Sequence, residues 1–189
     1  MTRQGEETRQ RLIRAALALF QSQGYHATGI AQILSHAGVP KGSLYHHFPE
    51  GKQALAVATV DFLAEEMAGR FARATEGGIP AEKQISRLFT DTAAWLEGHD
   101  YSQGALISLL AQEVETGETA LRARVAKAYR DATTQLAEAL ETGGASAPEE
   151  LATTVLATLD GALARARGQR STVALHRAGD ILSRVARAG

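Results

Sequence analysis

The sequence predicts an all-α fold of about nine helices, and three observations support this prediction. Only four prolines interrupt the 189 residues, and the chain lacks the runs of β-branched residues that are typical of strands. The strong helix formers Ala, Leu, Glu and Arg dominate its composition. Apolar residues recur near the 3.6-residue period of amphipathic helices, and segments rich in Gly or Pro separate these periodic stretches.

The first three predicted helices form a group at the N-terminus. A helix over about residues 6–23 has one apolar face and ends at Gly24, which suits a left-handed C-terminal residue. Thr28 is expected to cap a second helix. The apolar residues of that helix follow the spacing i, i+3, i+4 and i+7, and they are Ile30, Ile33, Leu34 and Ala37. Gly38 then permits a sharp turn, and Pro40 suits the first turn of a short third helix.

Six further helices follow, separated by clear breaks. The expected helices cover about 51–75, 81–98, 104–115, 119–141, a stretch behind residue 149, and a stretch from about residue 172. Segments with adjacent glycines at 77–78 and 143–144 end two of them. Ser146 and Glu149 fit a capping box, S-x-x-E, at the start of the eighth helix.

Composition and charge narrow the class of protein. The chain has no cysteine, which excludes disulfides and thiolate chemistry, and no apolar run long enough to span a bilayer. The N-terminus lacks the apolar stretch of a signal peptide, so we expect a cytoplasmic protein with no membrane partner. The net charge is −1, but residues 1–52 carry six Lys and Arg against three Glu, a net charge of +3. A basic N-terminal segment on an acidic body suggests a local polyanion site.

The third helix carries the chemistry expected of such a site. Leu44 and Phe48 supply an apolar face that can pack on a supporting helix. The other face presents polar and small residues to solvent: Lys41, Gly42, Ser43, Tyr45, His46 and His47. Two short helices joined by a sharp turn, with the second helix polar on one face, are typical of a helix-turn-helix that reads DNA.

The same segment resembles the TetR family of transcriptional repressors. The matching residues begin with a G-Y-x-A-T stretch and continue through Ala37-Gly38-Val39 to the run at 41–48, K-G-S-L-Y-H-H-F. Lys52 and the following Ala54-Leu55 also fit, and the resemblance covers residues 8–56 most strongly. The K-G-S-L-Y-H-H-F-P-x-G-K form and the C-terminal half resemble the LmrA/YxaF-like branch of the family.

The resemblance implies a domain organisation and a function. Residues 1–52 would form the helix-turn-helix DNA-binding domain, and residues 53–189 a larger helical domain that binds ligand and dimerises. The homodimer would bind a pseudo-palindromic operator in double-stranded DNA. A small-molecule effector, which we expect to be apolar or aromatic, would release the protein from DNA. We expect no cofactor and no metal.

Three sets of residues are assigned to these tasks. The DNA-binding set is Thr28, Lys41, Gly42, Ser43, Tyr45, His46 and Lys52. The effector set lies on the helices that surround the ligand in this family, and it is Phe62, Met67, Phe89, Thr92, Trp95, Gln112 and Tyr129. Its apolar and aromatic members are more often ordinary core residues than pocket residues, and Thr92 and Gln112 would supply polar groups to the ligand. The dimer set forms a thin apolar face on the last two helices: Leu151, Val155, Leu159, Ala162, Ala166, Ala178, Ile181, Leu182 and Val185.

Two positions depart from the family pattern and keep an alternative open. Gly29 stands where the family usually has a second hydroxyl residue, and Pro40 stands where serine is common. Both changes remove a candidate cap or phosphate contact. The alternative function is therefore a helical ligand-binding dimer that has lost operator binding.

Metal binding and catalysis find less support. His46 and His47 are adjacent, so their side chains diverge by about 100° on a helix, and no further ligand type lies nearby in sequence. The pair Glu65-Glu66 diverges in the same way and suits a solvated face. Ser, His and Asp residues that are scattered along the sequence occur in any chain of this length and do not indicate a catalytic triad. The sequence therefore favours a protein that is not an enzyme.

Overall fold

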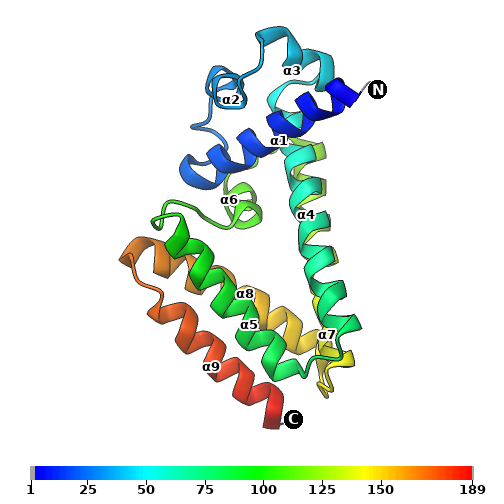
Figure 1. Ribbon diagram of the computed structural model, residues 1–189, viewed down its shortest axis with the longest axis vertical. Coiled ribbons are helices and arrows are strands. Elements are labelled where there is room, and N and C mark those ends of the chain that lie inside the picture. The colour runs from blue at the N-terminus through cyan, green and yellow to red at the C-terminus, as the bar shows by residue number, and fades with distance from the viewer. Residues whose placement is uncertain (1–2, 189) are drawn as a thin grey trace. The chain divides into compact units, whose positions relative to one another are not determined.

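The computed structural model describes residues 3–188, and every regular element in that range is an α-helix (Figure 1). The nine helices in that range are α1 (Arg3–Gln23), α2 (Ile30–Ala37), α3 (Lys41–His47), α4 (Lys52–Glu76), α5 (Ala81–Gly98), α6 (Leu106–Glu113), α7 (Thr119–Thr142), α8 (Pro148–Gln169) and α9 (Val173–Ala188). The predicted all-α fold is confirmed. No helix among the described residues is long and apolar enough to cross a membrane.

The helices form two compact units. The first unit comprises residues 1–64 and 106–128, and the second comprises residues 65–105 and 129–189. This grouping differs from a division at residue 52, because the first half of α4, α6 and the first turns of α7 all belong to the first unit. The predicted functional boundary at residue 52 stays a prediction.

The first unit is built around the apolar face of α1, which packs against α2, α3 and α6. Its largest fully buried side chains from the first three helices are Leu12, Ile13, Phe20, Ile33 and Leu44. The turn between α2 and α3 depends on Gly38, which has a positive φ of 62°. Arg11 Nη2 donates to the carbonyl oxygens of Ala37 (2.5 Å) and Gly38 (2.8 Å). A Cβ at Gly38 would lie 2.9 Å from that nitrogen. Glycine therefore permits both the positive φ and the close approach of the Arg11 side chain.

In the second unit, α5 packs along α9, and α8 packs against both (Figure 1). The core between them contains the buried side chains Ile85, Phe89, Leu96, Val155, Ala166 and Leu175. Small residues allow these helices to approach closely. At Gly179 of α9, an added Cβ would lie 2.8 Å from Phe89 Cβ of α5.

Two predicted helix caps are wrong. The N-cap of α2 is Gly29, not Thr28, because the Thr28 hydroxyl donates backward to the Gly24 carbonyl oxygen (2.6 Å). At α8 the N-cap is Ala147, no side-chain cap bond forms, and Pro148 occupies the first turn. The capping box predicted from Ser146 and Glu149 is therefore absent from this helix end. Proline in the first turn stabilises the helix start by presetting φ.

Candidate nucleic-acid interface

The helix α3 separates its two faces sharply. Leu44 is completely buried, and Phe48 at the end of the helix is 4% exposed, so this side anchors α3 to the rest of the unit. On the opposite side Lys41 and His46 are exposed, and the Tyr45 side chain is 49% exposed. An exposed tyrosine on a face that also carries a lysine and an imidazole suits contact with a polyanion.

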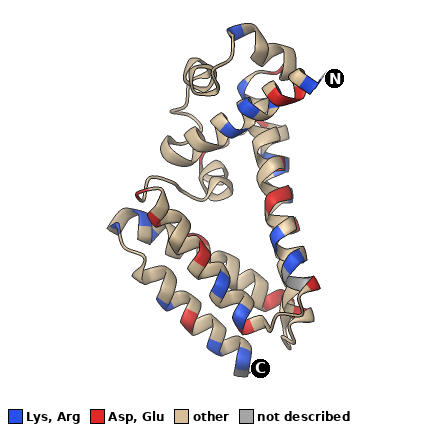
Figure 2. Cartoon of the chain, in the orientation of Figure 1, with Lys and Arg blue, Asp and Glu red and all other residues tan. Residues whose placement is uncertain are grey.

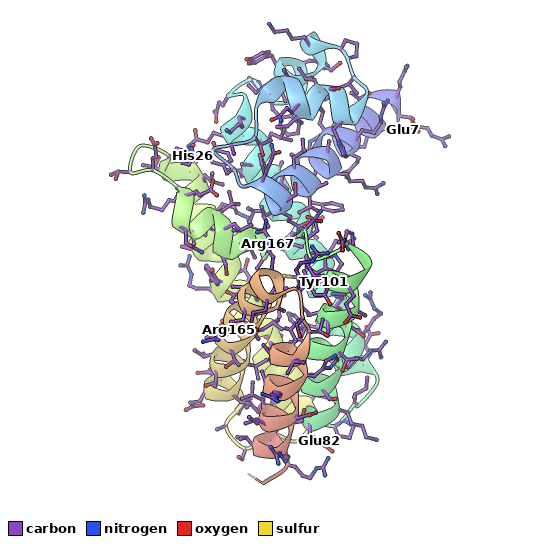
Figure 3. The ribbon with its side chains drawn as sticks, turned by 90° about the vertical axis from the view of Figure 1, so that its left-hand side faces the viewer. Glu7, His26, Glu82, Tyr101, Arg165 and Arg167 are labelled. Atoms are coloured by element: carbon purple, nitrogen blue, oxygen red, sulfur yellow. The ribbon has the colours of Figure 1, made fainter. Side chains whose placement is uncertain are left out.

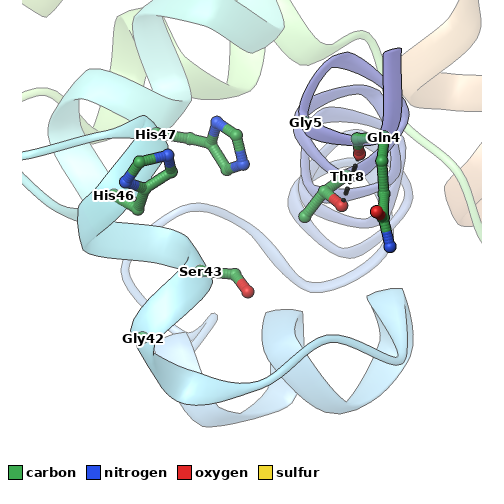
Figure 4. Close-up of a pocket in the computed structure, with 7 residues that line it drawn as sticks. All are labelled: Gln4, Gly5, Thr8, Gly42, Ser43, His46 and His47. Atoms are coloured by element: carbon green, nitrogen blue, oxygen red, sulfur yellow. Dashed lines mark hydrogen bonds between the residues drawn. The ribbon is translucent and has the colours of Figure 1, made fainter. Parts of the chain in front are cut away.

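A polar cavity of 380 Å³ lies between α3 and the start of α1 (Figure 4). Its lining residues are Gln4, Gly5, Thr8, Gly42, Ser43, His46 and His47. Sequence reasoning missed Gln4 and Thr8, which lie one turn apart at the start of α1, with Thr8 Oγ1 donating to the Gln4 carbonyl oxygen (2.9 Å). Their signal in the sequence was two polar residues at the i, i+4 spacing beside an exposed helix start.

The two histidines of α3 influence each other. Their ring centroids lie 4.9 Å apart in an edge-to-face arrangement. Partial burial lowers the pKa of His47 below its usual value, and the nearby positive charges of His46 and Arg9 lower it further, while Glu6 opposes the change. His47 is therefore harder to protonate than an isolated imidazole.

We expect the pKa of His47, followed by NMR titration of the free protein, to lie below 6.5. A folded-state pKa below the unfolded value means that this group adds stability above pH 6.5, and that the contribution is lost as pH falls through the folded pKa. In a His46→Gln variant the pKa of His47 should rise only part of the way toward its usual value, because burial is the larger cause of its decrease. An unchanged pKa in that variant would contradict the coupling.

Thr28 and Lys52 lie together and face inward. The Thr28 side chain is fully buried, and its hydroxyl also accepts a hydrogen bond from Gln23 Nε2 (3.1 Å). Lys52 Nζ donates to the Thr28 carbonyl oxygen (3.0 Å) and sits 4.3 Å from the centre of the Tyr25 ring. Burial lowers the pKa of Lys52, and nearby carboxylates oppose this change. Both residues hold the loop before α2 in place. Because the Thr28 side chain is fully buried, we do not propose it as a phosphate contact.

Further residues that the sequence did not single out tie this loop to α6 and to the start of α7. Tyr25 Oη donates to Glu118 Oε1 (2.6 Å). The backbone N–H of His26 donates to Glu113 Oε2 (2.8 Å), and Figure 3 shows His26 beside this part of the chain. Burial raises the pKa of Tyr25, and its bond to Glu118 raises it further. No sequence pattern signals these pairs, because about ninety residues separate the partners.

The basic excess of the first 52 residues is only partly available to DNA. Arg11 is used to hold the α2–α3 turn, and Lys52 holds the loop before α2. Arg3 pairs with Glu7 at 3.3 Å, both side chains being well exposed. Figure 2 shows the basic segments of α1 and α3 spread among acidic and neutral ones. Lys41 is therefore the cation of α3 that is best placed for a phosphate.

The seven predicted effector residues are distributed over both units. Phe62 and Gln112 belong to the first unit, and the other five belong to the second. Phe89 is 1% exposed and lies in the core of the second unit, where Met67 and Trp95 pack against that core. The Thr92 hydroxyl donates to the Leu88 carbonyl oxygen (2.7 Å). Phe89 thus has a structural role, and the effector assignment of the set stays a prediction.

The nine predicted dimer residues fall into three groups. Four are buried inside the protomer, and they are Val155, Ala162, Ala166 and Leu182. Ile181 and Val185 of α9 are 54% and 55% exposed. The remaining three, Leu151, Leu159 and Ala178, are half-buried. Packing among α5, α8 and α9 of the same chain buries the first group. Only the residues of the second and third groups are accessible to a second copy of the chain.

Among the described residues, no group of three or more His, Asp or Glu side chains is arranged to hold a metal ion. His46 and His47 have their rings close together, but they are not part of such a group.

Comparisons with known proteins agree with this geometry. Residues 12–59 match the family described as bacterial regulatory proteins, tetR family, and residues 80–181 match the LmrA/YxaF-like transcriptional regulator C-terminal domain. The HTH-type transcriptional regulator LmrA of Bacillus subtilis is 32% identical over 173 residues, covering 90% of this chain and 92% of the relative. The uncharacterized regulator YxaF of the same organism is 30% identical, covering 86% of each.

Solved structures share the fold. The reduced form of Escherichia coli NemR superposes with a TM-score of 0.81 and 26% identity, covering 94% of this chain and 96% of that one. A TetR regulatory protein from Rhodobacter sphaeroides gives a TM-score of 0.82 at 24% identity, covering 93% and 96%. With a helix-turn-helix that exposes its polar face and family matches over both parts of the sequence, this chain belongs to the TetR family of transcriptional regulators, in its LmrA/YxaF-like branch.

Proposed function

We propose that this chain is a ligand-responsive repressor that binds a pseudo-palindromic operator as a homodimer and leaves DNA when a small apolar or aromatic effector binds. One observation carries the DNA-binding part of the proposal: α3 exposes Lys41, Tyr45 and His46 while Leu44 is completely buried. A short helix anchored on one side and polar on the other is the form that enters a major groove.

The residues of α3 have separate tasks in this proposal. Lys41 and Ser43 donate to phosphate oxygens, and Tyr45 and His46 contact base edges or phosphates. Gly42 leaves the backbone open to close approach, since nothing lies within 4 Å of the position that its Cβ would occupy. The polar cavity beside α3 would receive the sugar-phosphate backbone. Lys52 acts on DNA chiefly through the loop that it braces.

The alternative, a ligand-binding dimer without operator binding, gains no support from the two unusual positions. Gly29 donates its backbone N–H to Gln32 Oε1 (2.9 Å), so the start of α2 is capped without a hydroxyl side chain. Pro40 takes a φ of −63° at the N-cap of α3, a conformation that proline adopts without strain. Both helices therefore begin normally. Binding to DNA from upstream of its own or a neighbouring gene decides between the two functions.

The Tyr45→Ala variant should bind operator DNA about 5- to 150-fold more weakly, because each good contact contributes about 1–3 kcal/mol. The measurement is a gel-shift titration at fixed salt concentration with a palindromic fragment from that upstream region. Tyr129→Ala is the matched control, because it removes a tyrosine that is 37% exposed in the second unit. An unchanged affinity in Tyr45→Ala, with the wild-type protein binding tightly, would reject the assignment of α3 as the contact helix.

Exposed apolar and small residues support dimerisation through the last two helices. On α9, Val173 (50% exposed), Ile181 and Val185 recur four or eight residues apart and so lie on one face. On α8 a second exposed stripe consists of small residues spaced by three and four, namely Ala157, Gly161, Ala164 and Gly168. Two copies that pair these faces would form a four-helix bundle with a two-fold axis, which matches the symmetry of a palindrome.

Two half-buried residues of the second unit support an apolar or aromatic effector. Met67 and Trp95 are apolar or aromatic, only half-buried, and packed beside the core of the second unit, which favours an apolar or aromatic ligand. A thermal-shift screen of uncharged aromatic compounds checks this part. Screening hits that are exclusively highly charged would reject it.

A further inference from the structure

The polar cavity between α3 and the start of α1 has an unusual set of ionisable groups. Of the seven described residues that line it, only His46 and His47 change charge near neutral pH. The others are two glycines, the amide of Gln4 and the hydroxyls of Thr8 and Ser43, which stay neutral. No Lys, Arg, Asp or Glu is among these lining residues. The charge of the lining therefore depends on how many of the two imidazoles hold a proton.

The two imidazoles lie close enough to act on each other. Their ring centroids are 4.9 Å apart, and Figure 4 shows the His47 ring pointing from α3 toward Gly5 and Thr8 of α1. A proton on one ring opposes a proton on the other, because like charges at this distance repel. An anion in the cavity would offset that repulsion and favour the doubly protonated pair.

The charged groups around His47 come from α1 and α3. Burial is the largest cause that lowers the pKa of His47, followed by His46 and by Arg9 of α1, while Glu6 of α1 opposes the change. Arg9 lies at this end of α3, since its guanidinium is 5.4 Å from the centre of the Phe48 ring. The helix α2, which also packs on α3, contains no Lys, Arg, Asp or Glu. In the free protein the surroundings of His47 thus favour the neutral ring.

We infer that operator binding takes up protons at His46 and His47, because a backbone phosphate of DNA in this cavity is held most tightly when both rings are cationic. The inference rests on the proposed DNA function and adds a dependence on pH to it. An imidazolium donates two N–H groups and carries a charge, whereas a neutral imidazole donates one and carries none.

The direction of the pH dependence follows from this difference between the free and bound states. The complex holds more protons on these rings than the free protein does, so operator affinity rises as pH falls. The rise ends below pH 6.5, where the free protein becomes protonated as well, since the pKa of its His47 is lowered from that value. A merely structural role of the two histidines would not produce this profile.

The test is a fluorescence-anisotropy titration of a labelled operator fragment with the full-length protein, at several pH values from about 6 to 8 and at constant ionic strength. The buffers contain no phosphate or sulfate, which would compete for the cavity. We expect the wild type to bind at least about tenfold more tightly at the acidic end, because uptake of one proton over one pH unit changes an equilibrium constant about tenfold.

Three variants locate the protons. His46→Gln and His47→Gln should each reduce the pH dependence, and the double variant should remove most of it. His36→Gln is the matched control, because it removes an exposed histidine from α2 of the same unit that does not line the cavity, and it should keep the wild-type profile. Operator binding by each variant at the alkaline end shows that it is folded.

Two results would overturn the inference: a wild-type affinity that does not change with pH, and a double variant that keeps the wild-type profile. Both leave the proposed DNA function intact, since the protein still binds its operator. A wild type that binds no operator at any pH in this range would instead refute the proposed function, and this inference with it.

Discussion

Replacing Phe89 by alanine is expected to lower the free energy of unfolding by about 3–5 kcal/mol, the usual effect of emptying a large core position. The side chain is 1% exposed and lies between α5 and α9. Close packing explains the size of the effect: a Cβ at Gly179 would lie 2.8 Å from Phe89 Cβ and 3.1 Å from its Cγ, so the two helices are already in contact and cannot close much further. The apolar cavity would therefore persist.

Urea denaturation at one fixed protein concentration measures this loss, because dimerisation would make the apparent stability depend on concentration. The control is Tyr129→Ala, which removes an aromatic side chain that is 37% exposed and should cost less than about 1 kcal/mol. A loss of less than about 1 kcal/mol for Phe89→Ala, together with altered effector binding, would instead place Phe89 in the wall of a ligand pocket.

Replacing Gly161 by leucine is expected to prevent dimerisation and to reduce operator affinity by about 100-fold or more, because one half-site bound alone loses the effective concentration that the second half-site supplies. Gly161 is exposed on α8, and nothing within the protomer lies within 4 Å of its missing Cβ. A larger side chain therefore meets no obstacle inside one chain. It obstructs only a helix of another copy that packs on this stripe.

Size-exclusion chromatography with light scattering checks the first part of this prediction, and gel-shift titration checks the second. The wild type should show twice the chain mass of 20.1 kDa, and Gly161→Leu should show the single mass. Gly98→Leu is the matched control, because Gly98 is also helical and also has open space at its Cβ position, but lies at the end of α5. A dimeric Gly161→Leu protein with wild-type operator affinity would refute the proposed interface.

The local features of the first unit followed from the sequence because they depend on neighbouring residues. The positive φ of Gly38 and the burial of Leu44 come from turn chemistry and helical periodicity over a few residues. Helix starts were less predictable. Thr28 suits an N-cap by residue type, but its hydroxyl is used by the Gly24 carbonyl oxygen, and only the folded loop reveals that competition.

Periodicity also identified the apolar residues of α8 correctly without showing what they face. Val155 and Ala166 are completely buried by α5 and α9 of the same chain, so they cannot serve the dimer for which they were proposed. The face that remains exposed on α8 consists of Ala157, Gly161, Ala164 and Gly168, whose small side chains give a weak hydrophobic signal. Helical spacing identifies residues that share a face, but the number of neighbouring helices determines how many faces are buried.

By itself the sequence determined the helical fold, the helix-turn-helix and its polar face, since propensity, periodicity and turn residues act over short stretches of chain. Only the tertiary structure decided which polar groups remain available. It turned Lys52 toward the Thr28 carbonyl, joined Tyr25 to Glu118, and brought Thr8 and His47 to one cavity. These pairings connect residues that are 24 to 93 positions apart. Their geometry is set by how helices pack, which no local pattern encodes.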